Sequence, residues 1–549
     1  MKTLINLSLL VLVLLFITLS PKKKEPMIQE KPNIIFIMSD DHAYQAISAY
    51  SDKLIETPNI DRLAKEGITF TNACVSNSIC APSRATILTG KHTHINGKID
   101  NQMPFDTTQV TFPQLFQQAG YQTAMFGKLH FGNNPKGVDE FMILPGQGSY
   151  INPDFITSKG DTTITGYVTD IITDLTINWI DQQRDPEKPF MLMYLHKAPH
   201  RPWWPSPEKF KEFVQKEFPE PASLFDDYAN RGTAAKTAEM NLLYDMMYNH
   251  DSKIRPETTA SMSNLEPAVR EYPNGFYGPY GRANAAQRAL YDPILDSINQ
   301  SFKENWPSMT TEEKMRWKYQ RYMQDYLACV SSVDDNVGRV LDYLDAHELA
   351  DNTMVVYTSD QGFYLGEHGW FDKRFIYEES FKTPLLVRWP NEIKAGITNE
   401  QMVQNLDFAQ TFLEAAQIKA PEDMQGESLM PLLTSDNAAW DRDAVYYHYY
   451  EYPAVHQVKR HYGIVTIDYK LAHFYYDVDE WELYDRKKDP SEMNNVYNDP
   501  AYADVVAELK TKLAALRVQY KDSEELDKYY IELHKKNNIR PPLEKSDKH

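Results

Sequence analysis

The chain has 549 residues, of which 42% are hydrophobic and 12% aromatic, so it can bury a large core and is not disordered; we expect one large domain plus a smaller one. It carries 57 basic and 77 acidic side chains, a formal net charge of −20, which argues against nucleic acid as a partner and requires any positive charge for an anionic substrate to be local. The three cysteines, Cys74, Cys80 and Cys329, exclude a disulfide scaffold.

The first residues have the pattern of an export signal. Lys2 precedes an apolar run from Leu4 to Leu19, which is too short and too close to the N-terminus for a comfortable spanning helix. We therefore interpret residues 1–24 as a signal peptide and linker, expect no stable membrane span, and expect a periplasmic or secreted protein. The alternative is an uncleaved anchor, because no small-x-small cleavage site is evident near Ser20 and three lysines follow.

Beyond this segment, short continuous apolar runs alternate with helical patterns. Such runs are typical of strands buried on both faces of a mostly parallel sheet. They lie at Asn33–Met38, Gln122–Phe126, Phe190–Leu195, Met354–Tyr357 and Leu385–Val387. The helical patterns include Ile60–Glu66, Val168–Asp181 and Tyr326–His347. This alternation predicts a doubly wound α/β sandwich.

Cys80 lies at the expected start of a short helix. Pro82 has a preset helical φ and no N–H to lose, and Gly90 can end a helix in a left-handed cap, so we expect the helix to begin at Pro82. The N–H groups and dipole of a helix start stabilise an anion, and Arg84 adds a positive charge one turn on. The alternative for a lone cysteine is a small buried thiol.

Polar residues follow four of the predicted strands, at Asp40-Asp41, Gly127–His130, Lys197–His200 and Ser359–Gly362. Any one of these clusters can be a helix cap or a turn. Together they lie where ligands bind in such sheets, beyond the carboxyl ends of the strands. Two adjacent carboxylates, a third carboxylate and an amide oxygen make an oxygen-rich pocket, which suits Ca²⁺ better than zinc.

Residues 80–90, Cys-Ala-Pro-Ser-Arg followed by Ala-Thr-Ile-Leu-Thr-Gly, resemble the active-site motif of the formylglycine-dependent (type I) sulfatases of the alkaline phosphatase superfamily. Flanking segments agree with this family: residues 57–64, Gly120-Tyr121, 369–374 and 383–387. The resemblance covers most of residues 32–430. It implies an alkaline phosphatase-like fold, with a large mixed, mostly parallel sheet sandwiched by helices.

The resemblance also implies a cofactor and a modification. Cys80 would be converted to 3-oxoalanine (formylglycine) by a formylglycine-generating enzyme or an anaerobic sulfatase-maturating enzyme, and its hydrated aldehyde would be the nucleophile. The positions that match the family's calcium ligands are Asp40, Asp41, Asp360 and Gln361, with a further oxygen from the modified Cys80. Gln361 departs from the pattern, since many members carry Asn or His there, but an amide oxygen can still ligate.

The remaining matches imply catalytic roles. Calcium, Lys128 and Lys373 would hold the sulfate oxygens, and Asp360 would take a proton from the attacking hydrate. His200, helped by Lys373, would protonate the leaving alcohol. The residues that would complete the cycle are His130, as the base that lets the sulfated intermediate collapse, and Arg84, which would stabilise the hydrate.

Residues next to these positions are candidates for reading a sugar. Arg201 and Trp203 follow His200, and Trp370 and Arg374 flank Lys373. Tryptophan faces stack on sugar rings, and arginine can pair with a carboxylate. For all of these, ordinary packing is the alternative. His461, in a segment that resembles one reaching the cleft in relatives, is a further candidate.

We expect a catalytic domain over residues 25–435, with a partly helical insertion at about 205–309, and a C-terminal subdomain and tail over 436–549. Short aromatic runs between Tyr446 and Asp485 predict a small antiparallel sheet. A helix from about Ala501 to Tyr520 places Val505, Leu509, Leu513 and Leu516 on one face, where they can pack on that sheet.

The leading function is hydrolysis of sulfate esters on a sulfated carbohydrate, such as a polysaccharide-derived oligosaccharide. One alternative is a phosphoester or phosphonate hydrolase of the same superfamily. A second is a non-catalytic binder of sulfated glycans that has kept the fold.

Overall fold

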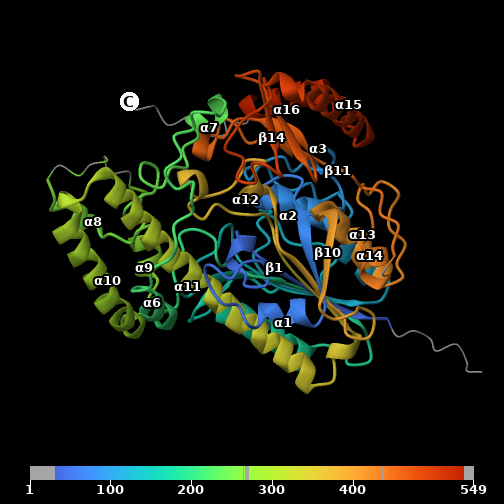
Figure 1. Ribbon diagram of the computed structural model, residues 1–549. Coiled ribbons are helices and arrows are strands. Elements are labelled where there is room, and N and C mark those ends of the chain that lie inside the picture. The colour runs from blue at the N-terminus through green and yellow to red at the C-terminus, as the bar shows by residue number, and fades with distance from the viewer. Residues whose placement is uncertain (1–30, 264, 266, 268–270, 436, 537–549) are drawn as a thin grey trace, which may run out of the picture.

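The computed structural model describes residues 31–536 except 264, 266, 268–270 and 436 (Figure 1). The predicted signal peptide at 1–24 lies outside the described residues. Within the part of the chain that is described, no helix combines the length and the apolar character that crossing a membrane requires.

A ten-stranded sheet forms the centre of the molecule, in the order β10-β2-β9-β8-β1-β7-β3-β4-β5-β6. Its middle strands, β8, β1, β7 and β3, are parallel to one another, and Ile37 of β1 aligns with Tyr194 of β7 and Tyr357 of β8. Their carboxyl ends therefore meet at one edge of the sheet. The middle strands span Asn33–Ser39 (β1), Gln122–Gly127 (β3), Phe190–Leu195 (β7) and Thr353–Ser359 (β8).

The outer strands make the sheet mixed, which confirms the predicted fold class. Strand β9 is antiparallel to both β8 and β2, and β5 is antiparallel to β4 and β6. The sequence pattern missed β2 and β10 because their sequences, ITFTNAC and ITNEQMVQ, interrupt the apolar runs with polar residues. The outer strands span Ile68–Cys74 (β2), Glu140–Ile143 (β4), Asp154–Thr157 (β5), Thr162–Thr163 (β6), Leu385–Arg388 (β9) and Ile397–Gln404 (β10).

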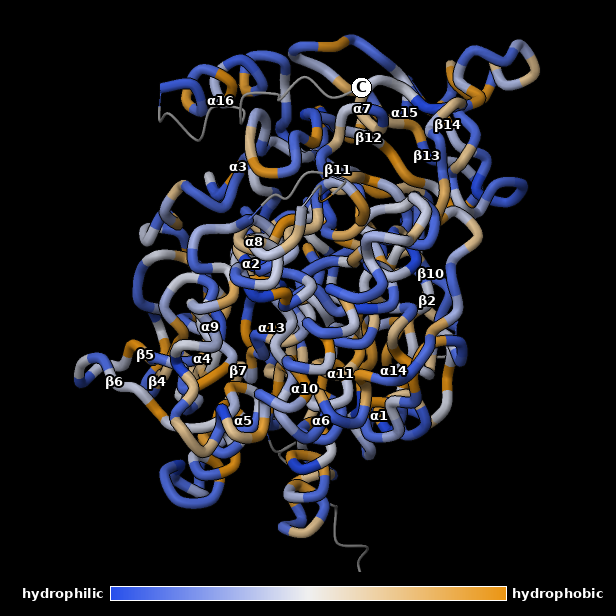
Figure 2. The backbone as a smooth tube through the Cα atoms, turned by 90° about the vertical axis from the view of Figure 1, so that its left-hand side faces the viewer, coloured by the Kyte–Doolittle hydropathy of each residue, from blue (hydrophilic) through white to orange (hydrophobic). Residues whose placement is uncertain are grey.

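Helices cover both faces of the sheet, and β1 contributes alternate side chains to each. Ile35 and Ile37 join the core under α1, α5 and α11, whereas Ile34 and Phe36 join the core under α2, α4 and α13. Full burial of one such side chain stabilises the fold by about 1.5–3 kcal/mol. Figure 2 shows the apolar residues recurring along the inner strands and helices, with hydrophilic loops outside. The covering helices are Ile60–Lys65 (α1), Cys80–Thr89 (α2), Phe112–Gln118 (α4), Val168–Asn178 (α5), Thr311–Ala346 (α11) and Phe408–Ala415 (α13).

Two helix starts differ from the prediction. The helix α2 begins at Cys80 and not at Pro82, because a proline is tolerated anywhere in a first turn, whose N–H groups have no acceptor inside the helix. Gly90 does cap its end in the left-handed conformation, with φ 62°. The helix α11 has 36 residues and begins at Thr311, where Thr310 and Glu313 form a capping box.

Residues 205–309 contain short helices and the 21-residue α10; α6 and α10 lie near α11 around buried Trp204, Tyr291 and Trp306, whereas α7 lies beside the C-terminal subdomain (Figure 1). This segment is thus partly helical, and its buried apolar residues are continuous with the core on one face of the central sheet. Its helices are Pro207–Phe213 (α6), Thr233–Thr237 (α7), Pro256–Ala260 (α8), Tyr277–Gly281 (α9) and Ala285–Asn305 (α10).

The C-terminal part forms the predicted antiparallel sheet, which has four strands in chain order. The helix α15 (Ala503–Gln519) packs Leu509 and Leu513 against it, as predicted, and a further helix, α16 (Glu524–Lys536), follows. This subdomain lies at the top of Figure 1. Its strands are Ala444–Tyr449 (β11), His461–Thr466 (β12), Tyr469–Phe474 (β13) and Glu480–Asp485 (β14).

Candidate active site

Direct hydrogen bonds join the carboxyl ends of β1 and β8. The Asp360 amide donates to the Ser39 carbonyl at 3.2 Å, and the Asp41 amide donates to Asp360 Oδ1 at 3.1 Å. Asp41 has a φ of 66°, and the Tyr326 hydroxyl, which donates to its carbonyl at 2.7 Å, holds this turn. The two strand ends therefore present their carboxylates to one point.

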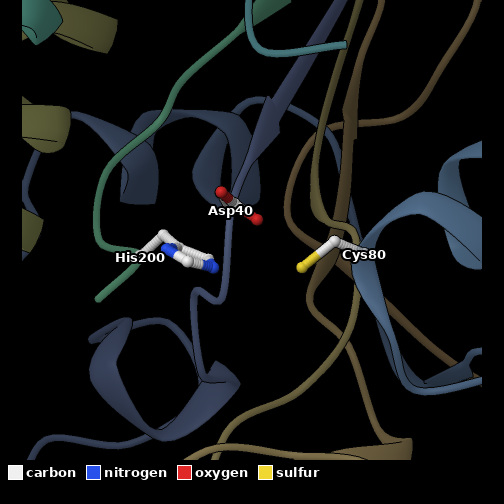
Figure 3. Close-up of side chains that lie close together, drawn as sticks. All are labelled: Asp40, Cys80 and His200. Atoms are coloured by element: carbon white, nitrogen blue, oxygen red, sulfur yellow. The ribbon is translucent and has the colours of Figure 1, made fainter. Parts of the chain in front are cut away.

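Three buried carboxylates meet at that point together with a cysteine and a histidine. Oxygens of Asp40, Asp41 and Asp360 lie within 4.8 Å of one another, and so do the ligating atoms of Asp40, Cys80 and His200. Figure 3 shows these last three side chains converging from the end of β1, the start of α2 and the segment after β7. The Cys80 Sγ is 4.0 Å from Asp41 Oδ1.

Three cationic side chains contact this acidic cluster. Arg84 contacts Asp360 Oδ2 through Nε and Nη2, both at 2.9 Å, and its Nη2 is 3.3 Å from Asp40 Oδ1. Lys128 donates to Asp40 Oδ2. Lys373 donates to Asp41 Oδ2 at 2.8 Å. The chain is strongly acidic as a whole, so the positive charge that an anionic substrate needs is concentrated here.

Burial and neighbouring charges set the protonation of the carboxyls. Burial opposes ionisation of Asp40, but Lys128 and Arg84 hold its pKa well below 3.8. Burial raises the pKa of Asp41 to about 7, although Lys373 lowers it. Burial likewise raises the pKa of Asp360 to about 6, against the effect of Arg84. Asp41 and Asp360 therefore hold a proton more readily than a free carboxyl group does, and a bound cation would favour their ionised forms.

The oxygen donors fit a hard divalent cation. Asp40 Oδ1 and Gln361 Oε1 are buried and have no hydrogen-bond partner among the described residues. The Gln361 Nε2 contacts Asp41 Oδ1 and lies 3.8 Å from the Cys80 Sγ, and an amide turned by 180° aims Oε1 at the same point. Oxygens of Asp40, Asp41, Asp360 and Gln361 are the donor type that Ca²⁺ prefers.

The two predicted catalytic histidines are neutral in this structure. The His200 Nδ1 faces the Arg201 carbonyl at 2.6 Å and so carries the proton, which leaves Nε2 unprotonated, 3.7 Å from Asp41 Oδ2. Burial lowers the pKa of His200 well below 6.5, and Lys128 lowers it further. His130 has a φ of 66°, and burial followed by Lys128 lowers its pKa in the same direction.

The residues predicted to contact a sugar fall into two groups. The first group is Arg201 and Arg374, which directly follow the catalytic candidates His200 and Lys373. Arg201 pairs with Asp251 of the insertion through two 2.5 Å contacts, and its guanidinium lies 5.1 Å from the Phe371 ring centroid. Arg374 contacts Asp372 at 2.9 Å and Glu451 at 3.0 Å. Both guanidinium groups are therefore held in place by carboxylates.

The second group lies in the core. Trp203 packs against Tyr322 with ring centroids 4.7 Å apart, and Trp370 stacks on Phe375 at 5.1 Å. Both His461 nitrogens face the backbone, with the Ile376 amide donating to Nε2 at 3.1 Å and Nδ1 lying 2.8 Å from the Lys459 carbonyl. All three side chains are at most 1% exposed, so in this structure their contacts are with other core residues.

Sequence reasoning missed several residues that contact this cluster. Gln147 accepts from the Lys128 ammonium, Asp372 pairs with Arg374, and Asn101 accepts from the Ala81 amide at 3.0 Å. Asp372 lies within residues 369–374, one of the segments that resemble the sulfatase family, so the sequence carried a signal for it. Gln147 and Asn101 lie in loops without a periodic pattern, so no local signal pointed to them.

Comparisons with known proteins agree with this geometry. Residues 32–418 match the family model described as Sulfatase, and residues 366–519 match the model of the C-terminal region of N-sulphoglucosamine sulphohydrolase. An N-acetylglucosamine-6-O-sulfatase of Bacteroides thetaiotaomicron is 48% identical over 511 residues, which cover 92% of this chain and 89% of that protein.

Solved structures extend the comparison. A protein solved in complex with its substrate D-glucosamine-2-N,6-O-disulfate superimposes with a TM-score of 0.85 at 47% identity, covering 91% of this chain and 100% of that one. A phosphonate monoester hydrolase of Agrobacterium radiobacter shares the fold, with a TM-score of 0.60 at 20% identity over 89% of this chain and 96% of that one.

The Sulfatase match contains the strand ends, the Cys80 helix and the Lys373 segment that build the buried cluster. The 48% identity extends over nearly the whole chain, insertion and C-terminal subdomain included. The chain therefore belongs to the sulfatase family of the alkaline phosphatase superfamily, and it is an enzyme that hydrolyses sulfate esters.

Proposed function

We propose that the chain removes the 6-O-sulfate from glucosamine-type sugars, as N-acetylglucosamine or N-sulfoglucosamine, in oligosaccharides derived from sulfated polysaccharides. The observation that carries this proposal is the burial of Cys80 among three carboxylates and three cations at the carboxyl edge of the sheet. The sugar is inferred from the two most similar proteins described above, an N-acetylglucosamine-6-O-sulfatase and a protein whose substrate carries 6-O-sulfate on glucosamine.

The environment of Cys80 supports its conversion to formylglycine. Burial raises the pKa of the thiol well above 9; Lys373 lowers it, and Asp40, Asp360 and Asp41 raise it further. A thiol that stays protonated at neutral pH is a poor nucleophile. The same surroundings favour a hydrated aldehyde, whose hydroxyls can donate to the carboxylates that destabilise a thiolate.

The chain's own residues can perform the remaining steps. The ammonium groups of Lys128 and Lys373 bind the sulfate oxygens and hold the ester in line with residue 80. Asp360, whose pKa burial raises to about 6, can accept the proton of the attacking hydroxyl. A calcium ion held by Asp40, Asp41, Asp360 and Gln361 would add positive charge beside the sulfate.

His200 and His130 can move protons on the leaving-group side and on residue 80 respectively. Because His200 Nδ1 is bonded to the Arg201 carbonyl, Nε2 is the nitrogen that delivers a proton to the leaving oxygen. The negative charge of a bound sulfate ester raises the pKa of His200 and so favours its protonation at Nε2. His130, neutral in this structure, can then take a proton as sulfate leaves residue 80.

We also propose that the enzyme is exported and that a maturating enzyme converts Cys80. Export is supported by the apolar run from Leu4 to Leu19, and maturation by a formylglycine-generating or anaerobic sulfatase-maturating enzyme is supported by the motif at residues 80–90.

The test is sulfate release from defined sugars by purified protein whose formylglycine content has been measured by peptide mass spectrometry. We expect release from 6-O-sulfated N-acetylglucosamine and from glucosamine-2-N,6-O-disulfate, with the 6-position desulfated. Sugars sulfated only at the 2-N or 4-O position and an aryl phosphate serve as controls. Release of phosphate at a higher rate than sulfate would favour the phosphoester hydrolase, and no release from any ester would refute the proposal.

A further inference from the structure

The first turn of α2 lacks a cap of its own. Its N-cap is Ile79, an apolar residue that has no side-chain acceptor, and Pro82 has no N–H. The Ser83 amide donates to the Ile79 carbonyl at 2.9 Å and begins the helical hydrogen bonds. The amides of Cys80 and Ala81 are thus left without an acceptor inside the helix that carries the reactive residue.

Asn101 supplies the missing cap from another loop. Its Oδ1 accepts from the Ala81 amide at 3.0 Å, which is the type of bond that an N-cap side chain normally makes. Asn101 lies between the short helix α3 (Thr93–Asn96) and α4. The orientation of the Cys80 turn therefore depends on the position of this loop.

Glu451 holds the loop and, with its second oxygen, the segment that carries Lys373. Its Oε2 accepts from the Asn101 amide at 2.7 Å, and its Oε1 accepts from Arg374 Nη1 at 3.0 Å. Glu451 is 3% exposed and Arg374 5%, so this ion pair is shielded from solvent. Arg374 directly follows Lys373, whose ammonium contacts Asp41.

Tyr447 makes a second bridge between the same two segments. Its hydroxyl accepts from the Ser78 amide at 3.2 Å and donates to the Arg374 carbonyl at 2.6 Å. Tyr447 belongs to β11 and Glu451 follows the end of that strand, so both come from the C-terminal subdomain. Tyr449 supports Glu451, because its hydroxyl donates to the Glu451 carbonyl at 2.9 Å.

We propose that Glu451, acting through Asn101 and Arg374, is a positioning residue that sets the separation between the nucleophile-bearing turn of α2 and the Lys373 turn. It does not touch the reacting atoms. The C-terminal subdomain thereby becomes part of the catalytic apparatus, because the Glu451 carboxylate, which lies outside the large sheet, holds two catalytic segments. These two segments are nearly three hundred residues apart in the sequence, roughly four times the sequence separation between Arg374 and Glu451. The proposal rests on the proposed function.

The first measurement is amide hydrogen exchange by mass spectrometry, which needs no activity. We expect Asn101→Ala to accelerate exchange in a peptide that covers residues 79–85 and to leave a peptide over 372–376 unchanged. Glu451→Ala should accelerate exchange in both peptides, because it releases both segments. Gln102→Ala, which changes the exposed neighbour of Asn101, is the control and should match the wild type.

The second measurement is steady-state sulfate release, normalised to formylglycine content. We expect Asn101→Ala to lower kcat about 10- to 100-fold with KM changed less than threefold, since a small displacement of reacting groups costs rate more than binding. Asn101→Asp retains an acceptor for the Ala81 amide and should recover most of kcat. Melting temperatures identify any variant that fails to fold.

Unchanged exchange at residues 79–85 in both Asn101→Ala and Glu451→Ala would overturn the proposal. So would equal losses of kcat in Asn101→Asp and Asn101→Ala, because the retained acceptor would then be without effect. A wild-type enzyme that releases no sulfate refutes the proposed function instead, and the exchange experiment still decides whether Glu451 couples the two segments.

Discussion

Lys373 and Asp41 form a buried ion pair with a distance of 2.8 Å between Nζ and Oδ2, although 332 residues separate them in the sequence. Lys373 is 3% exposed and Asp41 is fully buried. Because the pair is shielded from solvent, removing one partner leaves an uncompensated charge, which is far more costly than losing a surface ion pair.

Lys373→Ala should therefore impair both activity and stability. We expect kcat to fall by about 10²- to 10³-fold, the usual cost of removing one preorganised group that stabilises developing charge. We also expect a lower melting temperature, because Asp41 loses its only cationic side-chain partner among those that the structure describes. Sulfate release and thermal melting check this, and a kcat within threefold of the wild type would contradict it.

Cys80→Ala should remove activity and leave the fold intact. Among the described residues, the polar contacts of the Cys80 thiol are long, 4.0 Å to Asp41 Oδ1 and 3.8 Å from Gln361 Nε2, so little hydrogen bonding is lost. Cys80→Ser should behave in the same way in a host without serine-modifying machinery. The measurement combines sulfate release with thermal melting, and turnover near the wild-type rate in either variant would exclude formylglycine chemistry.

Removal of divalent cations should destabilise the protein. A ligand present at 100 times its dissociation constant stabilises the native state by about 2.7 kcal/mol. We expect a chelator to lower the melting temperature and calcium to restore it, with close to one calcium per chain by elemental analysis. Gln361→Leu removes one oxygen donor and should shift the calcium titration to higher concentration.

The matched control for the calcium experiment is Gln45→Leu. Gln45 is a glutamine that donates to Glu367 at 3.1 Å, outside the carboxylate cluster. An equal shift of the titration in both variants, or no effect of the chelator on melting, would argue against a calcium site at Asp40, Asp41 and Asp360.

Asp251→Asn tests whether Arg201 contacts the sugar. Asp251 pairs with Arg201 through two oxygens, and an asparagine keeps the shape but removes the charge that orients the guanidinium. We expect KM to rise about tenfold for a sulfated disaccharide, equivalent to about 1.4 kcal/mol, and to change little for a small aryl sulfate. Equal changes for both substrates would assign Arg201 to the structure of the site and not to sugar binding.

Glu378 should make stability depend on pH below about 5. Burial opposes its ionisation, but Arg486, Lys470 and Lys382 lower its pKa from 4.5 to about 2. The unfolded chain therefore binds this proton first as the pH falls, so the contribution of Glu378 is complete above 4.5 and is lost between 4.5 and about 2.

Glu378→Gln should consequently lower the free energy of unfolding at pH 7, and the difference from the wild type should narrow as the pH falls towards 3. Urea unfolding at several pH values measures it. A difference that stays constant or widens on acidification would show that the Glu378 carboxylate does not stabilise the fold through Arg486 and Lys470.

The sequence by itself indicated the middle strands of the central sheet and the predicted place of the site. Runs such as Asn33–Met38 and Phe190–Leu195 are apolar at every position because the strands they form are buried on both faces. Asp40, Asp41 and Asp360 follow such runs, and parallel strands bring their carboxyl ends together. Gly90 was predicted as a helix cap for an equally local reason, its tolerance of a positive φ.

Only the tertiary structure decided which side chains reach the site and what holds them. Trp203 and Trp370 neighbour His200 and Lys373 in sequence, yet both are buried in the core, because the direction of a side chain in a loop depends on distant packing partners. The bonds of Glu451 to Asn101 and Arg374 join three separate segments, and no local pattern encodes such contacts. Local sequence patterns thus indicated where the candidate site residues lie along the chain, and long-range packing set how their side chains are arranged in space.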